Sequence, residues 1–110
     1  YKKAFSNIEE IRCLDEKEYA KSSWHIFPIC IKNHRDDIFK ILRADNIGVN
    51  VHYIPIYLQP YYKKLGHREG LCPKAEKYYK EAITLPLYPA MSNGQLKAVV
   101  NRMKKAFNSL

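Results

Sequence analysis

The sequence predicts an α+β domain in which a small, mainly antiparallel sheet of three or four strands carries helices on one face. The chain has 110 residues, the usual length of one domain, and we expect residues 1–110 to form a single domain. Short β-forming runs alternate with helical runs in the order β-β-α-β-loop-α-β-α. Prolines and glycines separate these runs, and no repeat or long flexible linker interrupts them.

The first thirty residues predict the end of a helix and two strands. Residues 1–8 are interpreted as the tail of a helix whose beginning is missing, and residues 11–14 as a short strand. The charged residues 15–21 predict a loop or a weak helical turn. Residues 23–31 give the strongest strand pattern, since they are apolar on both faces and rich in β-formers. Pro28 among them favours an edge or a bulge, because proline cannot donate to the ladder.

The middle of the chain predicts a helix and then a strand. Residues 35–46 are predicted to form the helix. Two aspartates occupy its first turn, where the helix dipole favours anions. Ile38, Ile41 and Leu42 give it one apolar stripe. Residues 49–53 predict a strand, with alternate apolar side chains on one side.

The second half predicts a shaped loop followed by two helices and a strand between them. Two prolines in residues 55–62 forbid a regular strand there, so we expect a loop that leads into a short helix at residues 61–65. Residues 73–81 predict a helix with proline in its first turn, and residues 83–85 a strand. The clearest helix is the last, which begins with an S-x-x-Q capping box at Ser92 and Gln95.

Charge and cysteine content indicate the kind of partner and the compartment. The net charge is +8, and residues 46–110 carry ten basic and three acidic side chains, which should attract anions unless they form only a solvated face. Cys13, Cys30 and Cys72 are widely spaced, as buried thiols in a reducing compartment are, so we expect a cytoplasmic protein. No apolar run approaches the roughly 20 residues that span a bilayer, and we expect no membrane partner.

Motifs for catalysis are sparse. The sequence has no glycine-rich phosphate loop and no G-x-S-x-G turn, and Ser23 beside His25 lacks a neighbouring carboxylate. We therefore predict no catalytic, cofactor-binding or metal-binding residue within the chain. His52 ends the predicted strand before the loop, and both a structural and a site-lining role remain open for it.

Tyrosines gather in the same loop. Tyr53, Tyr57, Tyr61 and Tyr62 lie within ten residues, and two lysines follow them. A phenol combines apolar surface with a hydroxyl, which suits a ligand that is partly sugar-like and partly charged, or a wet protein interface. The alternative is a wedge of tyrosines under the sheet.

Read together, residues 48–100 resemble the C-terminal part of the DegT/DnrJ-type sugar aminotransferases, and with the similar segment SSWHIFPI upstream the resemblance spans essentially Ser22 onward. That family has Gly, then His-Tyr-x-Pro, Leu-Gln-Pro-x-Tyr, Gly, Pro-x-Ala-Glu and Leu-Pro-x-x-Pro before a closing helix. These positions are Gly48, His52, Tyr53, Pro55, Leu58, Gln59, Pro60, Tyr62, Gly66, Pro73, Ala75, Glu76, Leu85, Pro86 and Pro89. The segment HYIPIYLQPYY most resembles the corresponding segment in the transaminases of pseudaminic acid synthesis.

The resemblance implies the small C-terminal domain of an aspartate-aminotransferase-type (fold type I) homodimer. In such enzymes a large domain, absent here, holds pyridoxal phosphate on a lysine. The implied reaction moves an amino group, from glutamate by analogy, to a UDP-linked 4-keto-6-deoxy sugar for cell-surface polysaccharide; the fragment alone should be inactive. The implied substrate-binding residues are His52, Tyr53, Tyr57, Gln59 and Tyr62.

Two further points follow from the resemblance. Lys63, Lys64 and Arg68 would help to draw in the diphosphate. Tyr57 stands where the family usually has histidine, and a phenol can donate a hydrogen bond but cannot become cationic near neutral pH.

Two rival interpretations come from other classes: a standalone basic module that binds anions or nucleic acid, and a pure interaction domain. The tyrosines cluster in a proline-bound loop instead of alternating on strands, as stacking platforms for bases do. Neither rival explains the ordered motifs, so we expect no specific nucleic-acid partner.

Overall fold

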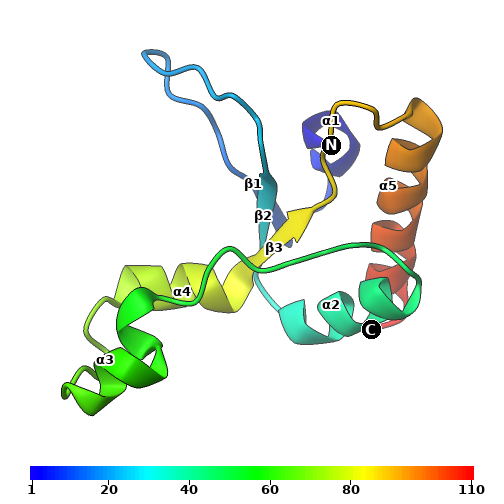
Figure 1. Cartoon of the computed structure of the whole chain (residues 1–110). Coiled ribbons are helices and arrows are strands. Elements are labelled where there is room, and N and C mark those ends of the chain that lie inside the picture. The colour runs from blue at the N-terminus through cyan, green and yellow to red at the C-terminus, as the bar shows by residue number, and fades with distance from the viewer.

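A computed structural model describes all residues from Tyr1 to Leu110. Its sheet has three antiparallel strands in the order β1 (Ile11–Cys13), β2 (Phe27–Ile31) and β3 (Ala82–Leu85) (Figure 1). β2 is central: Ile31 pairs with Ile11 on one side, and Ile29 pairs with Ile83 on the other. The small antiparallel sheet predicted from the sequence is therefore confirmed.

Pro28 lies in the regular pairing of the central strand, whereas the sequence predicted an edge strand or a bulge. Pro28 pairs with Thr84 of β3, but β1 reaches only as far as Ile29. At Pro28 the strand thus has a neighbour only in β3. The absence of an N–H group in proline therefore removes no hydrogen bond toward β1. The strand also begins later than predicted, at Phe27, after Trp24 takes a left-handed backbone conformation with φ of 50°.

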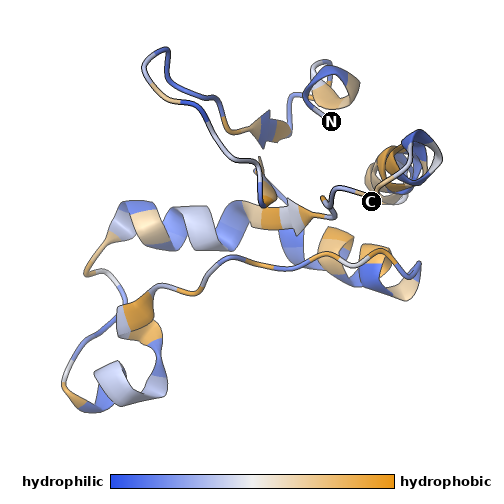
Figure 2. Ribbon diagram, turned by 45° about the horizontal axis from the view of Figure 1, so that its top comes forward, coloured by the Kyte–Doolittle hydropathy of each residue, from blue (hydrophilic) through white to orange (hydrophobic).

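Three helices cover the apolar face of the sheet (Figure 2). They are α1 (Lys2–Phe5), α2 (Arg35–Ala44) and α5 (Asn93–Asn108). One continuous core joins them to the strands, because alternate strand residues point to this face. Its members are Phe5, Ile11, Phe27, Ile29, Ile31, Ile38, Leu42, Val49, Ile83, Leu85, Val99, Val100, Met103 and Ala106.

The capping box predicted at the start of α5 is present. The Ser92 hydroxyl accepts a hydrogen bond from the Gln95 amide at 3.2 Å, and the Gln95 side chain accepts one from the Ser92 amide at 2.8 Å. α1 is shorter than the predicted residues 1–8, since it ends at Phe5. No helix combines the length and apolar character that crossing a membrane requires.

On the opposite face of the sheet, α4 (Pro73–Glu81) packs against β2. Cys30 pairs with Arg12 there, and the Arg12 guanidinium lies 3.2 Å from the Cys30 sulfur. Burial raises the pKa of Tyr78 in α4, and the nearby Cys30 thiol adds to the rise. α4 thus packs beside the second face, outside the main core.

The predicted strand at residues 49–53 is wrong, so the sheet has three strands and not four. Only Asn50 joins the sheet, through an isolated bridge to Thr84 with N–O distances of 3.1 and 2.7 Å. The Val51 amide then turns to the Asn50 side chain at 2.8 Å, which takes it out of the ladder. Val49 is nevertheless buried, which accounts for the apolar pattern.

Beyond this bridge the chain forms an arm that extends away from the core (Figure 1). The arm consists of residues 52–81 and contains the 3₁₀ turn η1 (Ile56–Leu58), α3 (Pro60–Lys64) and α4. Two prolines set its first turns, and Gly66, with φ of 94°, turns the chain after α3. None of the fourteen core residues belongs to the arm.

Candidate functional site

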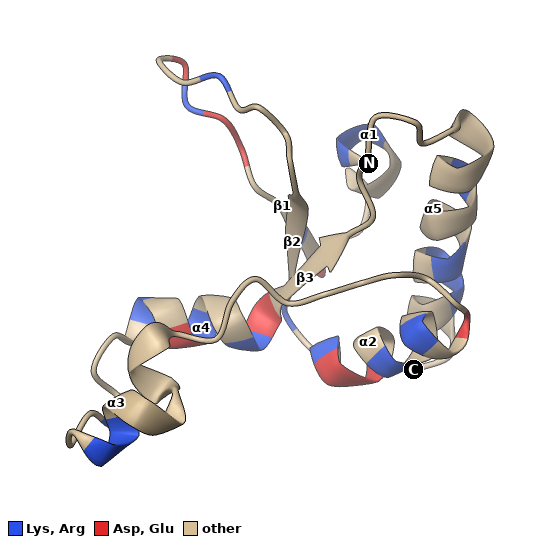
Figure 3. Cartoon of the chain, viewed as in Figure 1, with Lys and Arg blue, Asp and Glu red and all other residues tan.

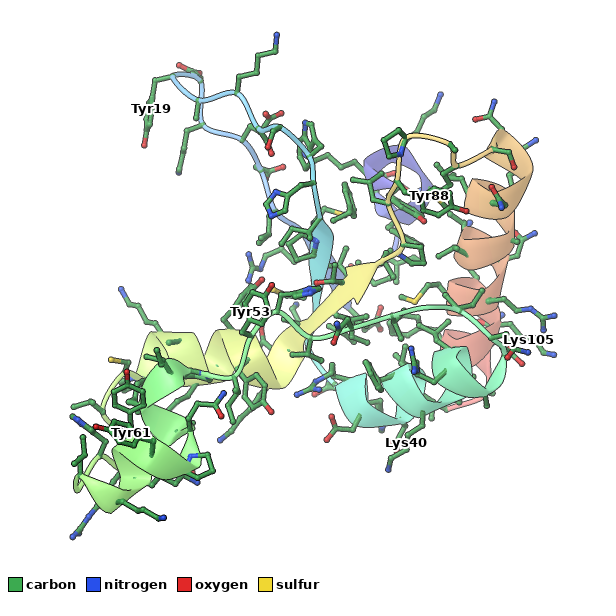
Figure 4. The ribbon with its side chains drawn as sticks, in the orientation of Figure 1. Tyr19, Lys40, Tyr53, Tyr61, Tyr88 and Lys105 are labelled. Atoms are coloured by element: carbon green, nitrogen blue, oxygen red, sulfur yellow. The ribbon has the colours of Figure 1, made fainter.

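The five predicted substrate-binding residues lie along the first part of the arm. We call them the strip: His52, Tyr53, Tyr57, Gln59 and Tyr62. Figure 4 labels Tyr53 near the sheet, and Tyr61, the neighbour of Tyr62, toward the far end of the arm. The strip is therefore extended, and its members fall into three different environments.

His52 is held at the base of the arm by the sheet. Its Nδ1 lies 2.8 Å from the Thr84 hydroxyl, and Thr84 is buried in β3. The ring of Tyr53 meets the imidazole edge-on, with 4.5 Å between the ring centroids. Because one ring nitrogen is engaged, the imidazole has a fixed orientation and its other nitrogen is left for a ligand.

His52 also lines the largest hollow of the molecule, an open groove of about 600 Å³. The groove lies between the Asn46–His52 segment, the end of β3 and α5. No lysine, arginine, aspartate or glutamate lines it; its polar walls come from His25, Asn46, Asn50, His52, Thr84, Tyr88 and Gln95. No other member of the strip reaches it.

Asn50, Thr84 and Gln95 are groove residues that sequence reasoning missed as site candidates. A weak signal existed for Thr84, which is the one polar residue in the strand Ala82–Leu85. Gln95 was explained by the capping box alone. His25, which also lines the groove, is exposed.

Tyr57 differs from the rest of the strip because it is buried. Only 9% of the residue is exposed, and its hydroxyl donates a 2.6 Å hydrogen bond to Glu76, which is 7% exposed. The same carboxylate accepts the Gly70 amide at 2.8 Å, and the Cys72 amide donates to the Tyr57 oxygen at 3.2 Å. This geometry favours a role for Tyr57 in holding the arm together.

The remaining strip residues face outward. Tyr53 is 72% exposed and Gln59 is exposed, while Tyr62 is half-buried between Tyr61 and His67. Exposed apolar side chains continue along the arm at Ile56, Tyr61, Leu65 and Leu71. Tyr53, Gln59 and Tyr62 thus lie on a surface without an opposite wall, whereas small-molecule sites are concave.

Basic residues mark the far end of the arm (Figure 3). Lys63 and Lys64 lie in the last turn of α3, and Arg68 follows in the exposed connection to α4. Glu69 beside them pairs with Lys80 at 2.9 Å, and this pair raises the pKa of Lys80. The three predicted anion-attracting residues are exposed, but they lie apart from the groove.

The chain by itself does not fit pyridoxal phosphate. A cofactor lysine needs an enclosed site that shields the reacting centre from water. All fourteen lysines here are exposed, and none lines the groove. No three histidine, cysteine or acidic side chains gather in a way that could hold a metal ion.

Comparison with known sequences identifies the class of protein. The family model described as "DegT/DnrJ/EryC1/StrS aminotransferase family" matches residues 1–104. Protein MJ1066 of Methanocaldococcus jannaschii is 37% identical over 96% of this chain and 29% of its own length. A UDP-4-amino-4,6-dideoxy-N-acetyl-β-L-altrosamine transaminase of Campylobacter jejuni is 29% identical over 97% of the chain and 31% of its own length.

Solved structures show the same fold. The putative sugar aminotransferase Spr1654 of Streptococcus pneumoniae, in its PMP form, superposes with a TM-score of 0.90 at 27% identity, over 98% of this chain and 28% of that one. Helicobacter pylori PseC, an aminotransferase of pseudaminic acid biosynthesis, gives 0.88 at 25% identity, over 99% and 30%. The fold is thus one found within fold type I sugar aminotransferases.

The chain belongs to the DegT/DnrJ/EryC1/StrS aminotransferase family. It spans about three tenths of the length of the relatives it matches. The resemblance inferred from the motif string is confirmed.

Proposed function

We propose that this chain is the small C-terminal domain of a pyridoxal-phosphate-dependent sugar-nucleotide aminotransferase. The family match over residues 1–104 carries the proposal. Two observations support the assignment to one domain of a larger enzyme: the chain covers only about three tenths of its relatives, and none of its lysines is enclosed. The cofactor would then be held by another part of the polypeptide.

The substrate we propose is a UDP-linked 4-keto-6-deoxy sugar, with glutamate as amino donor, in the cytoplasm. The names of the Campylobacter transaminase and of PseC support this sugar class. An uncharged groove beside His52 and exposed lysines at the end of the arm offer complementary environments for a ligand with neutral and anionic parts.

The part played by this chain is to supply one wall of the site. Tyr53, Gln59 and Tyr62 offer hydroxyl and amide groups for sugar hydroxyls, and His52 is already oriented by Thr84. Because these three residues have no opposite wall within the chain, the second wall would come from the large domain or from the other subunit of a homodimer. The exposed apolar side chains of the arm would be covered by the same contact.

The test uses the whole polypeptide that contains this chain, loaded with pyridoxal phosphate. We expect it to convert glutamate to 2-oxoglutarate in the presence of a UDP-linked 4-keto-6-deoxy sugar, and the 110-residue chain alone to show no turnover. Absence of turnover with every keto sugar nucleotide tried, by a folded enzyme loaded with cofactor, would contradict the proposal. Binding of single-stranded nucleic acid by the chain that persists at high salt would favour the rival anion-binding module.

A matched pair of variants tests the strip. Gln59→Ala and Tyr53→Phe should raise the KM for the sugar nucleotide more than they lower kcat, as expected for groups that bind ground and transition states alike. Tyr19→Phe is the control, because Tyr19 is 89% exposed on the β1–β2 connection (Figure 4). Unchanged KM in both strip variants would remove the strip from the site.

A further inference from the structure

The arm meets the core at a corner where α4 runs directly into β3. α4 ends at Glu81 and β3 begins at Ala82, whose backbone is already extended. The last carbonyl groups of a helix have no partner within the helix and need donors from elsewhere. At this corner the donors come from Arg35, the first residue of α2.

The Arg35 guanidinium binds two consecutive carbonyls at the end of α4. Its Nε donates to the Lys80 carbonyl at 2.8 Å, and its Nη2 donates to the Tyr79 carbonyl at 2.9 Å. The planar fork fixes the direction of both bonds at once, which an ammonium group cannot do. Hydrogen bonds from a charged donor are also stronger than those between neutral groups.

Arg35 is itself held in place. Its side chain is only 14% exposed, and its Nη1 lies 3.0 Å from a carboxylate oxygen of Asp36. The guanidinium also lies 5.6 Å from the centre of the Tyr79 ring, within the range of a cation–π contact. Because Arg35 begins a helix that packs on the core through Ile38 and Leu42, the fork connects the end of the arm to a rigid element.

The arm has few other attachments. On its incoming side the Asn50–Thr84 bridge and the His52–Thr84 hydrogen bond hold the chain, both on one residue of β3. On its outgoing side α4 continues covalently into β3 and packs beside β2, where Tyr78 lies near Cys30. The fork from Arg35 adds the side-chain hydrogen bonds that join the end of α4 to α2.

We propose that Arg35 is a positioning residue that sets the direction of the arm relative to the core. It thereby fixes the distance between His52 at the groove and the strip residues farther along the arm. The purpose of that positioning rests on the proposed function, whereas the positioning itself is a property of this chain.

The experiment measures residual dipolar couplings of backbone amides in the 110-residue chain. In the native chain the couplings of α4 and α5 should fit one alignment tensor. In Arg35→Met, which keeps the aliphatic stem and loses the donors, we expect the couplings of α4 to shrink relative to those of α5. Amides at the end of α4 should also exchange with solvent about tenfold faster, the effect expected when charge-assisted hydrogen bonds are lost.

Two further variants make the result specific. Arg43→Met is the matched control, since Arg43 is an exposed arginine in the last turn of the same helix. Arg35→Lys should give an intermediate result, because lysine can reach one carbonyl but cannot form the fork, and it replaces Arg35→Met should that variant not fold. If α4 and α5 keep one common tensor without the fork, whatever the change in melting temperature, the proposal is overturned.

Kinetics of the whole polypeptide separate this proposal from the proposed function. If Arg35→Met loosens α4 in the chain but leaves the KM for the sugar nucleotide unchanged, the strip is not the substrate site and Arg35 still positions the arm. If KM rises without any loosening of α4, Arg35 acts on the substrate in another way and the positioning role is wrong.

Discussion

The Tyr57 hydroxyl and the Glu76 carboxylate form a buried hydrogen bond of 2.6 Å that joins η1 to α4 across the arm. The carboxylate also accepts the Gly70 amide, so the loop between α3 and α4 is bound to the same group. No other side chain of the arm is buried. The internal order of the arm therefore depends on this pair.

Tyr57→Phe should lower the melting temperature of the chain. The ring is retained, but the buried Glu76 carboxylate loses one of its two donors and the Cys72 amide loses its acceptor, which is costly for buried polar groups. A loss of one hydrogen bond corresponds to a shift of about 5 °C in a domain of this size. Thermal unfolding monitored by circular dichroism measures this change in melting temperature, with Tyr19→Phe as the control. An unchanged melting temperature would show that the hydroxyl is free to serve a ligand.

Stability should fall in acid through the same pair. The hydrogen bond from Tyr57 lowers the pKa of Glu76 below the ordinary value of 4.5. A carboxyl whose pKa is lower in the folded state stabilises the fold above about pH 4.5, and the contribution is lost as the pH falls through the folded-state pKa. The difference in melting temperature between the native chain and Glu76→Gln should therefore be largest near neutral pH and shrink below pH 4.5. A difference that stays constant into acid would contradict this assignment.

Alkaline titration should show three tyrosines that ionise late, because the pKa values of Tyr1, Tyr57 and Tyr78 are all raised. Burial, together with the bond to Glu76, raises the pKa of Tyr57 from 10.0 to about 12. Burial raises the pKa of Tyr1 to about 12 as well. A raised folded-state pKa means that stability is intact below pH 10 and is lost as the pH rises toward 12. Phenolate absorbance after a rapid pH jump should show the late step smaller by one tyrosine in Tyr57→Phe and intact in Tyr19→Phe.

Local patterns predicted the regular elements well. The helix at residues 73–81 coincides with α4, and the helix at residues 35–46 with α2 except at its last two residues. Both follow from apolar spacing and proline or charge placement, which act within a few residues. The strand at residues 49–53 failed because a strand needs a neighbour along its length, and β3 offers one only at Asn50.

The candidate site was predictable only in part. The motif string pointed to the correct family, and His52 does line the groove. Its partner Thr84 lies 32 residues farther on, and the partner of Tyr57 lies 19 residues farther on. Such long-range pairs depend on how the arm folds back, which no local pattern encodes. The roles of the strip residues in substrate binding stay predictions.

Ser92→Ala should destabilise the chain through the start of α5. The hydroxyl accepts the Gln95 amide, one of the first N–H groups of the helix, which otherwise have no partner. Loss of such a cap costs about 0.5–2 kcal/mol. Urea unfolding gives the free energy directly, and Ser109→Ala, at the far end of the same helix, is a control for the loss of a serine hydroxyl. Equal losses of unfolding free energy in the two variants would show that the Ser92 cap contributes no more than another serine hydroxyl of the same helix.

Thr84→Val should release His52 without disturbing the sheet. Valine keeps the shape and the β-propensity of threonine, and the backbone bridge to Asn50 does not involve the side chain. The imidazole loses the hydroxyl 2.8 Å from Nδ1 and should sample more than one orientation. Nitrogen-15 NMR of the imidazole measures this as a change in tautomer populations, with His25 as an internal reference in the same spectrum. Thr84→Ser, which restores the hydroxyl, should return His52 to the native spectrum. If the signals of His52 are the same in Thr84→Val as in the native chain, the hydroxyl does not orient the imidazole, and the base of the arm is held by the Asn50 bridge alone.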